Sequence, residues 1–189
     1  MNEIRDDFWK QVEPEHLKAR AFCRKLMGNR DDGDDLYQDC LIHALSKYNL
    51  LRDKAAFKPW LYRLIVNSFK NRIKSPWWKR ALPFTSDEMI SAGNDPSAAH
   101  MAKFRLEKAF KAVSPDDRAL ITLFEMHRWK ISEIAEMTGS TEGAIKVRLS
   151  RTRQKMRKSL TEYLKQSGST VHELLTKDEI CVVSRSAKD

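Results

Sequence analysis

Apolar residues recur at spacings of three and four along most of this chain, and this period restricts it to a helical fold. The period is clear in residues 3–27, 34–48 and 58–74, and it resumes near Met101. Glycine and proline number only six each, which is too few for the turns of an all-β protein. The chain is therefore predicted to be all-α.

Composition divides the 189 residues into two small helical domains joined by a flexible linker. The linker is placed at residues 81–100, which lack a clear period and contain Gly, Asn and Pro. The domains are then residues 1–80 and 101–160. Residues 161–189 form a tail to which the sequence assigns no role.

Two helix starts carry recognisable capping residues. Ser114 is a suitable N-cap, Pro115 suits the first helical position, and Asp116 and Asp117 favour the positive end of the helix dipole. Asp34 is expected to cap an earlier helix in the same way.

The net charge of +9 is concentrated in two stretches of the chain. Residues 58–80 and 143–160 each carry seven basic side chains and no acidic one, whereas residues 81–100 carry acids and no Lys or Arg. Neutralisation of phosphates supplies much of the affinity of proteins for nucleic acids. Two basic stretches therefore favour two contacts on one long polyanion, although solvated helix faces would show the same charge.

Residues 131–158 have the spacing of a helix-turn-helix. Ala135 is small enough for two helices to cross closely, Gly139 permits the left-handed backbone of the turn, and Ile145 packs the second helix against the first. Ser132 is expected to cap the first helix. A plain helical hairpin with a basic face is the simpler alternative.

The second helix of this motif is expected to be capped by Ser140 and to run to about Arg157. Its apolar residues point inward, so its basic residues face outward and fit the major groove, where they read guanine edges or hold phosphates. These basic residues are Lys146, Arg148, Arg151, Arg153 and Lys155.

The helix at residues 58–74 is a second candidate nucleic-acid surface. Asparagine reads base edges and basic residues hold phosphate, and the face opposite the apolar stripe carries Asn67, Lys70, Asn71 and Arg72. The preceding loop from Arg52 to Phe57 is suited to an unstacked base, because pockets and aromatic faces bind single strands. Burial in the core is the competing interpretation for Phe57.

Two motifs of the first half stand in a fixed order before the helix-turn-helix. They are Asp-Asp-Leu-Tyr-Gln-Asp at residues 34–39 and Ala-Phe-Lys-Pro-Trp-Leu-Tyr-Arg-Leu-Ile-Val-Asn at residues 56–67. Together they resemble region 2 of the extracytoplasmic-function class of bacterial sigma factors. Residues 131–153 resemble region 4 of the same class, and the resemblance covers about residues 5–160.

The resemblance implies a protein that binds core RNA polymerase and directs it to promoters. Region 4 would read the minus-thirty-five element as duplex, and region 2 would capture the minus-ten element and help to open it. By position, Lys146, Val147 and Arg151 match base-facing residues of region 4, and Arg148, Arg153 and Lys155 match phosphate contacts. Val147 is apolar and suits a thymine methyl group.

In region 2 the resemblance assigns three groups of residues. Asn67, Lys70, Asn71 and Arg72 match the helix that reads the minus-ten element, and Arg52–Phe57 match the loop that accepts a flipped base. The helix that contacts the polymerase clamp corresponds to Asp35, Gln38, Asp39 and Ile42.

The expected partners are core polymerase, promoter DNA and an anti-sigma factor that covers two basic faces which would otherwise bind DNA unselectively. The free chain is expected to be a monomer without cofactor, metal or enzymatic activity. Three widely spaced cysteines suit a reducing cytoplasm. No stretch approaches the roughly 20 apolar residues of a membrane helix.

The main alternative is an ordinary helix-turn-helix regulator with a helical sensor or dimerisation domain at its N-terminus. Such a regulator would not need the motifs within residues 34–72. Two metal sites are weaker alternatives: the Asp-rich residues 31–35 match the spacing of a Mg²⁺ motif in prenyl-transferring enzymes, and Cys40 and His43 share a helix face near Cys23. Neither has enough further ligands at close spacing.

Overall fold

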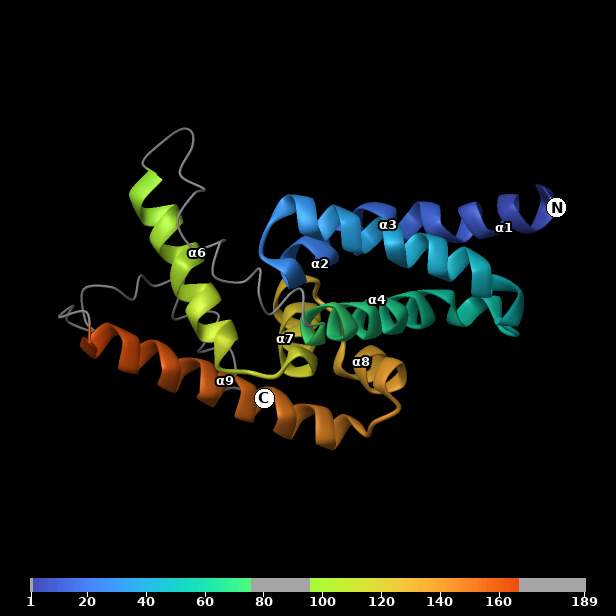
Figure 1. The fold of residues 1–189 in the computed structure, drawn as a ribbon. Helices are drawn as coiled ribbons and strands as arrows, with labels where there is room; N and C mark the ends of the chain where they lie inside the picture. The colour runs from blue at the N-terminus through green and yellow to red at the C-terminus, as the bar shows by residue number, and fades with distance from the viewer. Residues whose placement is uncertain (1, 76–95, 167–189) are drawn as a thin grey trace.

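The computed structural model describes residues 2–75 and 96–166, which form helices joined by short turns (Figure 1). These two ranges contain no strand, so the predicted all-α class is confirmed. The α-helices are α1 (Asn2–Val12), α2 (His16–Met27), α3 (Arg30–Lys47), α4 (Phe57–Lys74), α6 (Pro96–Lys111), α7 (Pro115–Ile121), α8 (Ile131–Thr138) and α9 (Glu142–Gln166).

The first predicted helix, residues 3–27, is divided into α1 and α2. Pro14 lies in the 3-10 turn Glu13–Glu15 between them, because proline lacks the N–H group that a continuous helix would use there. Helix α2 then ends at Gly28, whose φ of 81° is left-handed and favours glycine.

The predicted linker is partly helical. Helix α6 begins at Pro96, so residues 96–100 are already helix, and residues 161–166 of the predicted tail continue α9. The remainder of the linker and of the tail lies outside the described residues.

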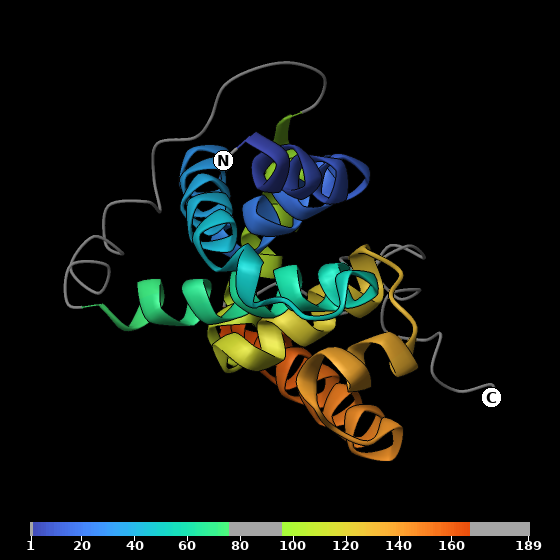
Figure 2. The ribbon, with the colours of Figure 1, turned by 90° about the vertical axis from the view of Figure 1, so that its right-hand side faces the viewer.

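Helix α4 lies between two layers of helices. Helices α1 to α3 are on one side of it, and α7, α8 and α9 are on the other, as two perpendicular views show (Figures 1 and 2). Leu61, Ile65 and Phe69 of α4 are completely buried. A helix that is covered by both layers positions each of them relative to the other.

Apolar packing continues from one half of the chain into the other. The ring centroids of Tyr62 on α4 and Trp129 are 4.6 Å apart, and Phe22 of α2 meets the ring of His127 edge-on at 5.3 Å. Buried residues of both halves form one contiguous cluster. Sequence analysis predicted two domains and not this packing, because helical periodicity does not reveal which distant residues meet.

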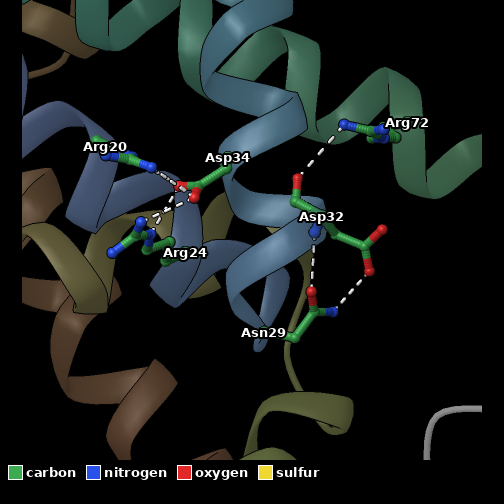
Figure 3. A network of polar contacts seen from close by, with 6 residues as sticks. All are labelled: Arg20, Arg24, Asn29, Asp32, Asp34 and Arg72. Atoms are coloured by element: carbon green, nitrogen blue, oxygen red, sulfur yellow. Dashed lines mark hydrogen bonds and ion pairs between the residues drawn. The ribbon is translucent and has the colours of Figure 1, made fainter.

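A carboxylate clamp joins α2 to α3 (Figure 3). Asp34 Oδ1 accepts hydrogen bonds from the Nε atoms of Arg20 and Arg24 at 2.8 and 2.7 Å, and Oδ2 accepts a second bond from each guanidinium. Hydrogen bonds from Arg24 and Arg20 hold the pKa of Asp34 well below its ordinary value. Bidentate, charge-assisted pairs of this kind fix geometry as well as adding attraction.

Asp34 therefore does not cap a helix, and the prediction that it does is wrong. Helix α3 begins earlier, at Arg30, and its cap is Asn29, whose side chain accepts a hydrogen bond from the backbone N of Asp32 at 2.9 Å. Asn and Asp are equally good caps, so the sequence did not distinguish the two starts.

Helices α2 and α3 approach closely at Gly33. A Cβ atom added to Gly33 would lie 2.3 Å from the Cα and 2.7 Å from the backbone N of Arg24. Only glycine allows this approach, because the obstructing atoms belong to the backbone and cannot rotate away.

We expect Gly33→Ala to lower the free energy of unfolding by about 1–3 kcal/mol, because the added methyl group forces α2 and α3 apart. The matched control is Gly143→Ala, where an added Cβ meets no atom within 4 Å. That exposed helical position should gain roughly 0.5–1 kcal/mol from alanine. Urea denaturation followed by circular dichroism measures both, and equal effects would contradict the close approach.

The clamp also predicts a dependence of stability on pH. Because the folded-state pKa of Asp34 is depressed, its contribution is present above the unfolded-state pKa of about 3.9 and is lost as the pH falls through the lower, folded-state pKa. Asp34→Asn should therefore be less stable at neutral pH and lose less stability on acidification below about pH 4.

The measurement is the free energy of unfolding from urea titrations at several pH values. Asp31→Asn, an exposed carboxylate of the same helix, controls for the loss of one acidic group. If Asp34→Asn loses stability on acidification as steeply as the unmutated chain, the clamp does not contribute to the pH dependence.

Candidate nucleic-acid interface

Helices α8 and α9 form the predicted helix-turn-helix. Gly139 ends α8 with φ 68°, which is the left-handed conformation predicted for the turn. Ile134 and Ile145 are buried where the two helices pack. The turn is closed by a hydrogen bond of 3.0 Å from the backbone N of Ser140 to the carbonyl of Ala135.

The caps of both helices differ from the predicted serines. The N-cap of α8 is Lys130, whose backbone N donates to the side chain of Glu133 in the first turn at 2.8 Å, and Ser132 lies inside the helix. Thr141 rather than Ser140 caps α9, because its Oγ1 accepts from the backbone N of Ala144 at 3.2 Å. By contrast, Ser114 caps α7 as predicted and accepts from the backbone N of Asp117.

One face of α9 projects away from the core. Ile145, Leu149 and Thr152 are buried, whereas the side chains on the outer face are exposed, with Val147 at 50%. Among the α9 residues predicted to bind DNA, the exposed ones are Lys146, Val147, Arg151 and Lys155. An exposed stripe of basic residues on the second helix of such a motif has the form that enters a major groove.

Two other basic residues of α9 are held inside the back half. Arg148 Nε donates to Asp117 Oδ1 at 2.6 Å, and Arg153 Nε donates to Glu125 Oε1 at 2.9 Å. The Arg153 side chain is only 17% exposed, and its guanidinium also lies over the ring of Phe124. Arg153 therefore joins α9 to the π-helical turn Thr122–Met126, and its charge is already paired within the chain.

Asp117, which binds Arg148, is kept in its ionised form by the residues around it. Burial alone would raise the pKa of Asp117, but hydrogen bonds from Arg148 and Ser114 outweigh burial, and the pKa lies below its ordinary value. Asp117 is consequently a negative charge beside the basic face of α9 at neutral pH.

The four α4 residues predicted to bind DNA divide into two pairs. Asn67 and Asn71 are exposed. Lys70 Nζ lies 2.9 Å from Asp116 Oδ1 of α7, and Arg72 faces the N-terminal half of α3, where its Nη1 lies 3.5 Å from the carbonyl oxygen of Asp32 (Figure 3). The asparagines are thus free to reach a base, whereas both basic residues already have partners within the chain.

The loop before α4 corrects one predicted residue. Arg52 is exposed, but Phe57 is 2% exposed and begins α4. Its ring packs edge-on against Phe8 and Tyr48, each with centroids 6.0 Å away. Phe57 therefore belongs to the core and offers no ring face to an unstacked base in this structure.

The residues predicted to contact the polymerase clamp share the outer face of α3. Asp35, Gln38, Asp39 and Ile42 are all exposed, and Ile42 is 71% exposed. Asp39 precedes Ile42 by one helical turn, so an acidic and an apolar side chain are exposed side by side, and their contact with the clamp stays a prediction.

Sequence analysis missed a set of contacts that joins α4 to the back half. Arg63 Nε donates to the carbonyl of Met137 at 2.6 Å, and Lys58 Nζ donates to Glu133 Oε1 at 2.7 Å. The surplus of basic residues on α4 was visible, but no sequence signal indicated that their partners lie on α8.

The weaker alternative sites have structural explanations. Asp34 of the Asp-rich segment is bound by two arginines, and Cys23 and Cys40 are completely buried. Burial raises the pKa of Cys40 to about 11 and that of Cys23 further, so both thiols stay protonated at neutral pH. Cys181 lies outside the described residues.

The described part of the chain contains neither a candidate metal site nor a membrane-spanning helix. Within residues 2–75 and 96–166, no three His, Cys, Asp or Glu side chains are grouped so that they could hold a metal ion. None of the helices in those ranges combines the length and apolar character needed to span a bilayer.

Comparison with known proteins gives two family matches. Residues 12–79 match the family model for sigma-70 region 2, and residues 103–156 match that for sigma-70 region 4. The two matches together cover more than half of the chain, and they contain α4 and the helix-turn-helix respectively.

Several curated relatives are sigma factors of the extracytoplasmic-function (ECF) class. SigG of Mycobacterium tuberculosis is 23% identical, and the match covers 82% of this chain and 49% of the relative, so the chain spans about half the length of that protein. SigM of M. tuberculosis is 26% identical over 77% of this chain and 72% of its own length. Another relative, the RNA polymerase sigma factor SigV of Bacillus subtilis, is 28% identical over 71% of this chain and 79% of its own length.

A solved structure shows the same fold. The sigma factor RpoE from Bartonella quintana, crystallised in complex with the anti-sigma factor NepR, matches with a TM-score of 0.56 at 23% identity, over 82% of this chain and 97% of the RpoE chain. Both sigma-70 region matches occur in this one chain, and several of its curated relatives are ECF sigma factors, so this chain belongs to the ECF group of the sigma-70 family.

Proposed function

We propose that this chain is a sigma factor, which binds core RNA polymerase and directs promoter-specific initiation of transcription. The observation that carries the proposal is the presence of two separate candidate DNA-binding faces in one chain. One is the exposed face of α9, with Lys146 and Arg151, and the other is the edge of α4 that exposes Asn67 and Asn71.

The two faces suit two forms of DNA. A basic helix that follows a tight turn docks in the major groove of intact duplex, which supports α9 as the reader of the minus-thirty-five element. Amide side chains on an exposed helix hydrogen-bond base edges, which supports α4 as the element that binds the minus-ten strand. Arg52, in the loop before α4, is exposed, and we propose that this loop contacts the same strand.

Strand opening needs binding energy from several sources. Unstacking a base costs a few kcal/mol, which the proposed role recovers by binding the separated strand and by association with polymerase. The outer face of α3, with Asp35, Gln38, Asp39 and Ile42, is the proposed contact with the polymerase clamp. This role requires no cofactor and no catalytic group of this chain, and it places the protein in the cytoplasm.

We further propose an anti-sigma factor as a regulatory partner. Two observations support it: the exposed basic surface of α9 and the likeness of this fold to RpoE, which was crystallised with the anti-sigma factor NepR. Without a partner, the free chain is proposed to be a monomer.

The proposal is tested by run-off transcription with purified core polymerase, with and without this chain. We expect initiation on native promoter templates only when the chain is present. Initiation by core polymerase that is independent of the chain, combined with binding of the chain to duplex operators as a dimer, would instead support the helix-turn-helix regulator.

Two arginines of α9 should respond differently to alanine. Arg151 is exposed, so Arg151→Ala should cost about 1–3 kcal/mol of binding at one base pair of the minus-thirty-five element and relax specificity there. Arg153 is bound to Glu125, so Arg153→Ala should lower the melting temperature and leave sequence preference unchanged.

Both outcomes are measured with the reconstituted holoenzyme on promoters altered one base pair at a time, together with thermal denaturation of the free chain. If Arg151→Ala weakens all promoters equally, Arg151 contacts a phosphate rather than a base.

A further inference from the structure

The loop before α4 is tied to α1 by the carboxylate of Asp7. This loop, residues 48–56, consists of the 3-10 turns Tyr48–Leu50 and Lys54–Ala56 and the three residues between them. Asp7 Oδ2 accepts a hydrogen bond from the Tyr48 hydroxyl at 2.7 Å, and the Lys54 ammonium lies 3.8 Å from the same oxygen. One oxygen of α1 therefore contacts both turns of the loop.

Tyr48 is the centre of this attachment. Its ring is almost completely buried, meets the Phe8 ring edge-on at 5.3 Å and meets the Phe57 ring at 6.0 Å. The Lys54 ammonium lies 3.3 Å from the centre of the same ring. Burial, together with the neighbouring Asp7, raises the pKa of Tyr48 to about 12, so the hydroxyl keeps the proton that it donates at neutral pH.

The outer part of the loop remains accessible. Arg52 and Asp53 are exposed, and Leu50 is 77% exposed. Asp53 Oδ1 accepts a hydrogen bond from the backbone N of Ala55 at 2.9 Å, which shapes the second turn locally. The loop is thus fixed at both turns and open between them, and a receptor for one small group needs supporting residues that are held in this way.

The α1 side of this attachment lies outside the part of the chain that matches a family model. Asp7 and Phe8 precede residues 12–79, which match sigma-70 region 2, whereas Tyr48 and Lys54 lie within that range. Because Phe57 is buried in the core, a base that enters this loop would contact the loop's own residues. Recognition of the base then depends on how firmly those residues are held.

We propose that Asp7 is a positioning residue for promoter opening, which holds the loop at residues 48–56 in the shape that accepts an unpaired base of the minus-ten strand. This inference rests on the proposed function, in which the loop contacts that strand. Without the carboxylate, the Tyr48 ring still packs in the core, but Lys54 is released and the two turns are no longer held together. The loop then loses pre-organisation for the base.

Folding should depend much less on Asp7 than base recognition does. The side chains of Lys54 and Asp7 are 42% and 50% exposed, and ion pairs at such exposure add little to stability. Lys54, once released, is free to bind a phosphate of the same strand. The total affinity for the strand is therefore a poor measure of positioning, and the contribution of a single base is the informative quantity.

The experiment compares Asp7→Ala with Asp6→Ala in the reconstituted holoenzyme. Asp6 is an exposed acid of the same helix, so the control removes the same charge. The probes are single-stranded oligonucleotides with the non-template minus-ten sequence of a promoter that is active in the run-off assay, each with one base replaced by an abasic site. Fluorescence anisotropy measures Kd, and the penalty at each position is the ratio of Kd without and with the base.

In the unmutated holoenzyme, we expect the captured base to show a penalty on the order of tenfold, because binding of an unstacked base contributes substantially to affinity. Asp7→Ala should reduce this penalty to about two- to threefold and leave the penalties at other positions unchanged. Asp6→Ala should change none of them. A purely structural defect would weaken the binding of every oligonucleotide by the same factor and leave the ratios as they were.

Tyr48→Phe provides a second variant that removes only the hydroxyl and keeps the ring between Phe8 and Phe57. We expect a penalty at the captured base between those of Asp7→Ala and the unmutated chain, because the pair between Asp7 and Lys54 remains. Thermal denaturation followed by circular dichroism checks that each variant folds. If Asp7→Ala does not fold, Tyr48→Phe decides the question.

The outcomes separate this inference from the proposed function. A full penalty at the captured base in both variants would overturn positioning by Asp7 and leave base capture by the loop in place. If no abasic site weakens binding to the unmutated holoenzyme, the loop captures no base, and that part of the proposed function fails together with this inference. Run-off transcription still decides independently whether the chain directs initiation.

Discussion

The packing of α4 between two helical layers is the constraint on which the other features of this structure depend. Its residues Leu61, Ile65 and Phe69 are completely buried in the core that both halves share. It also meets the back half, because Tyr62 packs against Trp129 just before α8, and Lys58 and Arg63 bind residues of α8. A helix used in this way cannot shift toward one layer without losing contact with the other, so the position of α4 sets which of its side chains reach solvent.

The basic residues of the chain differ in whether an acidic side chain of the same chain binds them. Arg20 and Arg24 are bound to Asp34 and stabilise the front half, and Arg153 is bound to Glu125 and stabilises the back half. Charges deep in such clamps are unavailable to a ligand, because breaking them leaves an unpaired charge in a partly buried site. Exposed basic residues such as Lys146 and Arg151 have no such cost and are the better candidates for DNA.

Several features were predictable from the sequence because they depend on neighbouring residues alone. Gly139 adopts the left-handed turn, and Ser114 caps α7, since backbone geometry and capping are local effects. Asp34 and Phe57 were misassigned because each has a local pattern that fits two roles. Hydrogen bonds from Arg20 and Arg24 of α2 decide the role of Asp34, and packing against Phe8 decides that of Phe57.

The sequence by itself determined that the chain is helical, that it carries a helix-turn-helix with a basic second helix, and that it resembles sigma factors in both halves. These properties follow from periodicity, turn chemistry and motif order, which are all read along the chain. Only the tertiary structure decided that the halves share one core and that Lys70 and Arg148 are held by Asp116 and Asp117. The reason is that the charge of a residue is visible in sequence, whereas its partner depends on which distant helices pack together.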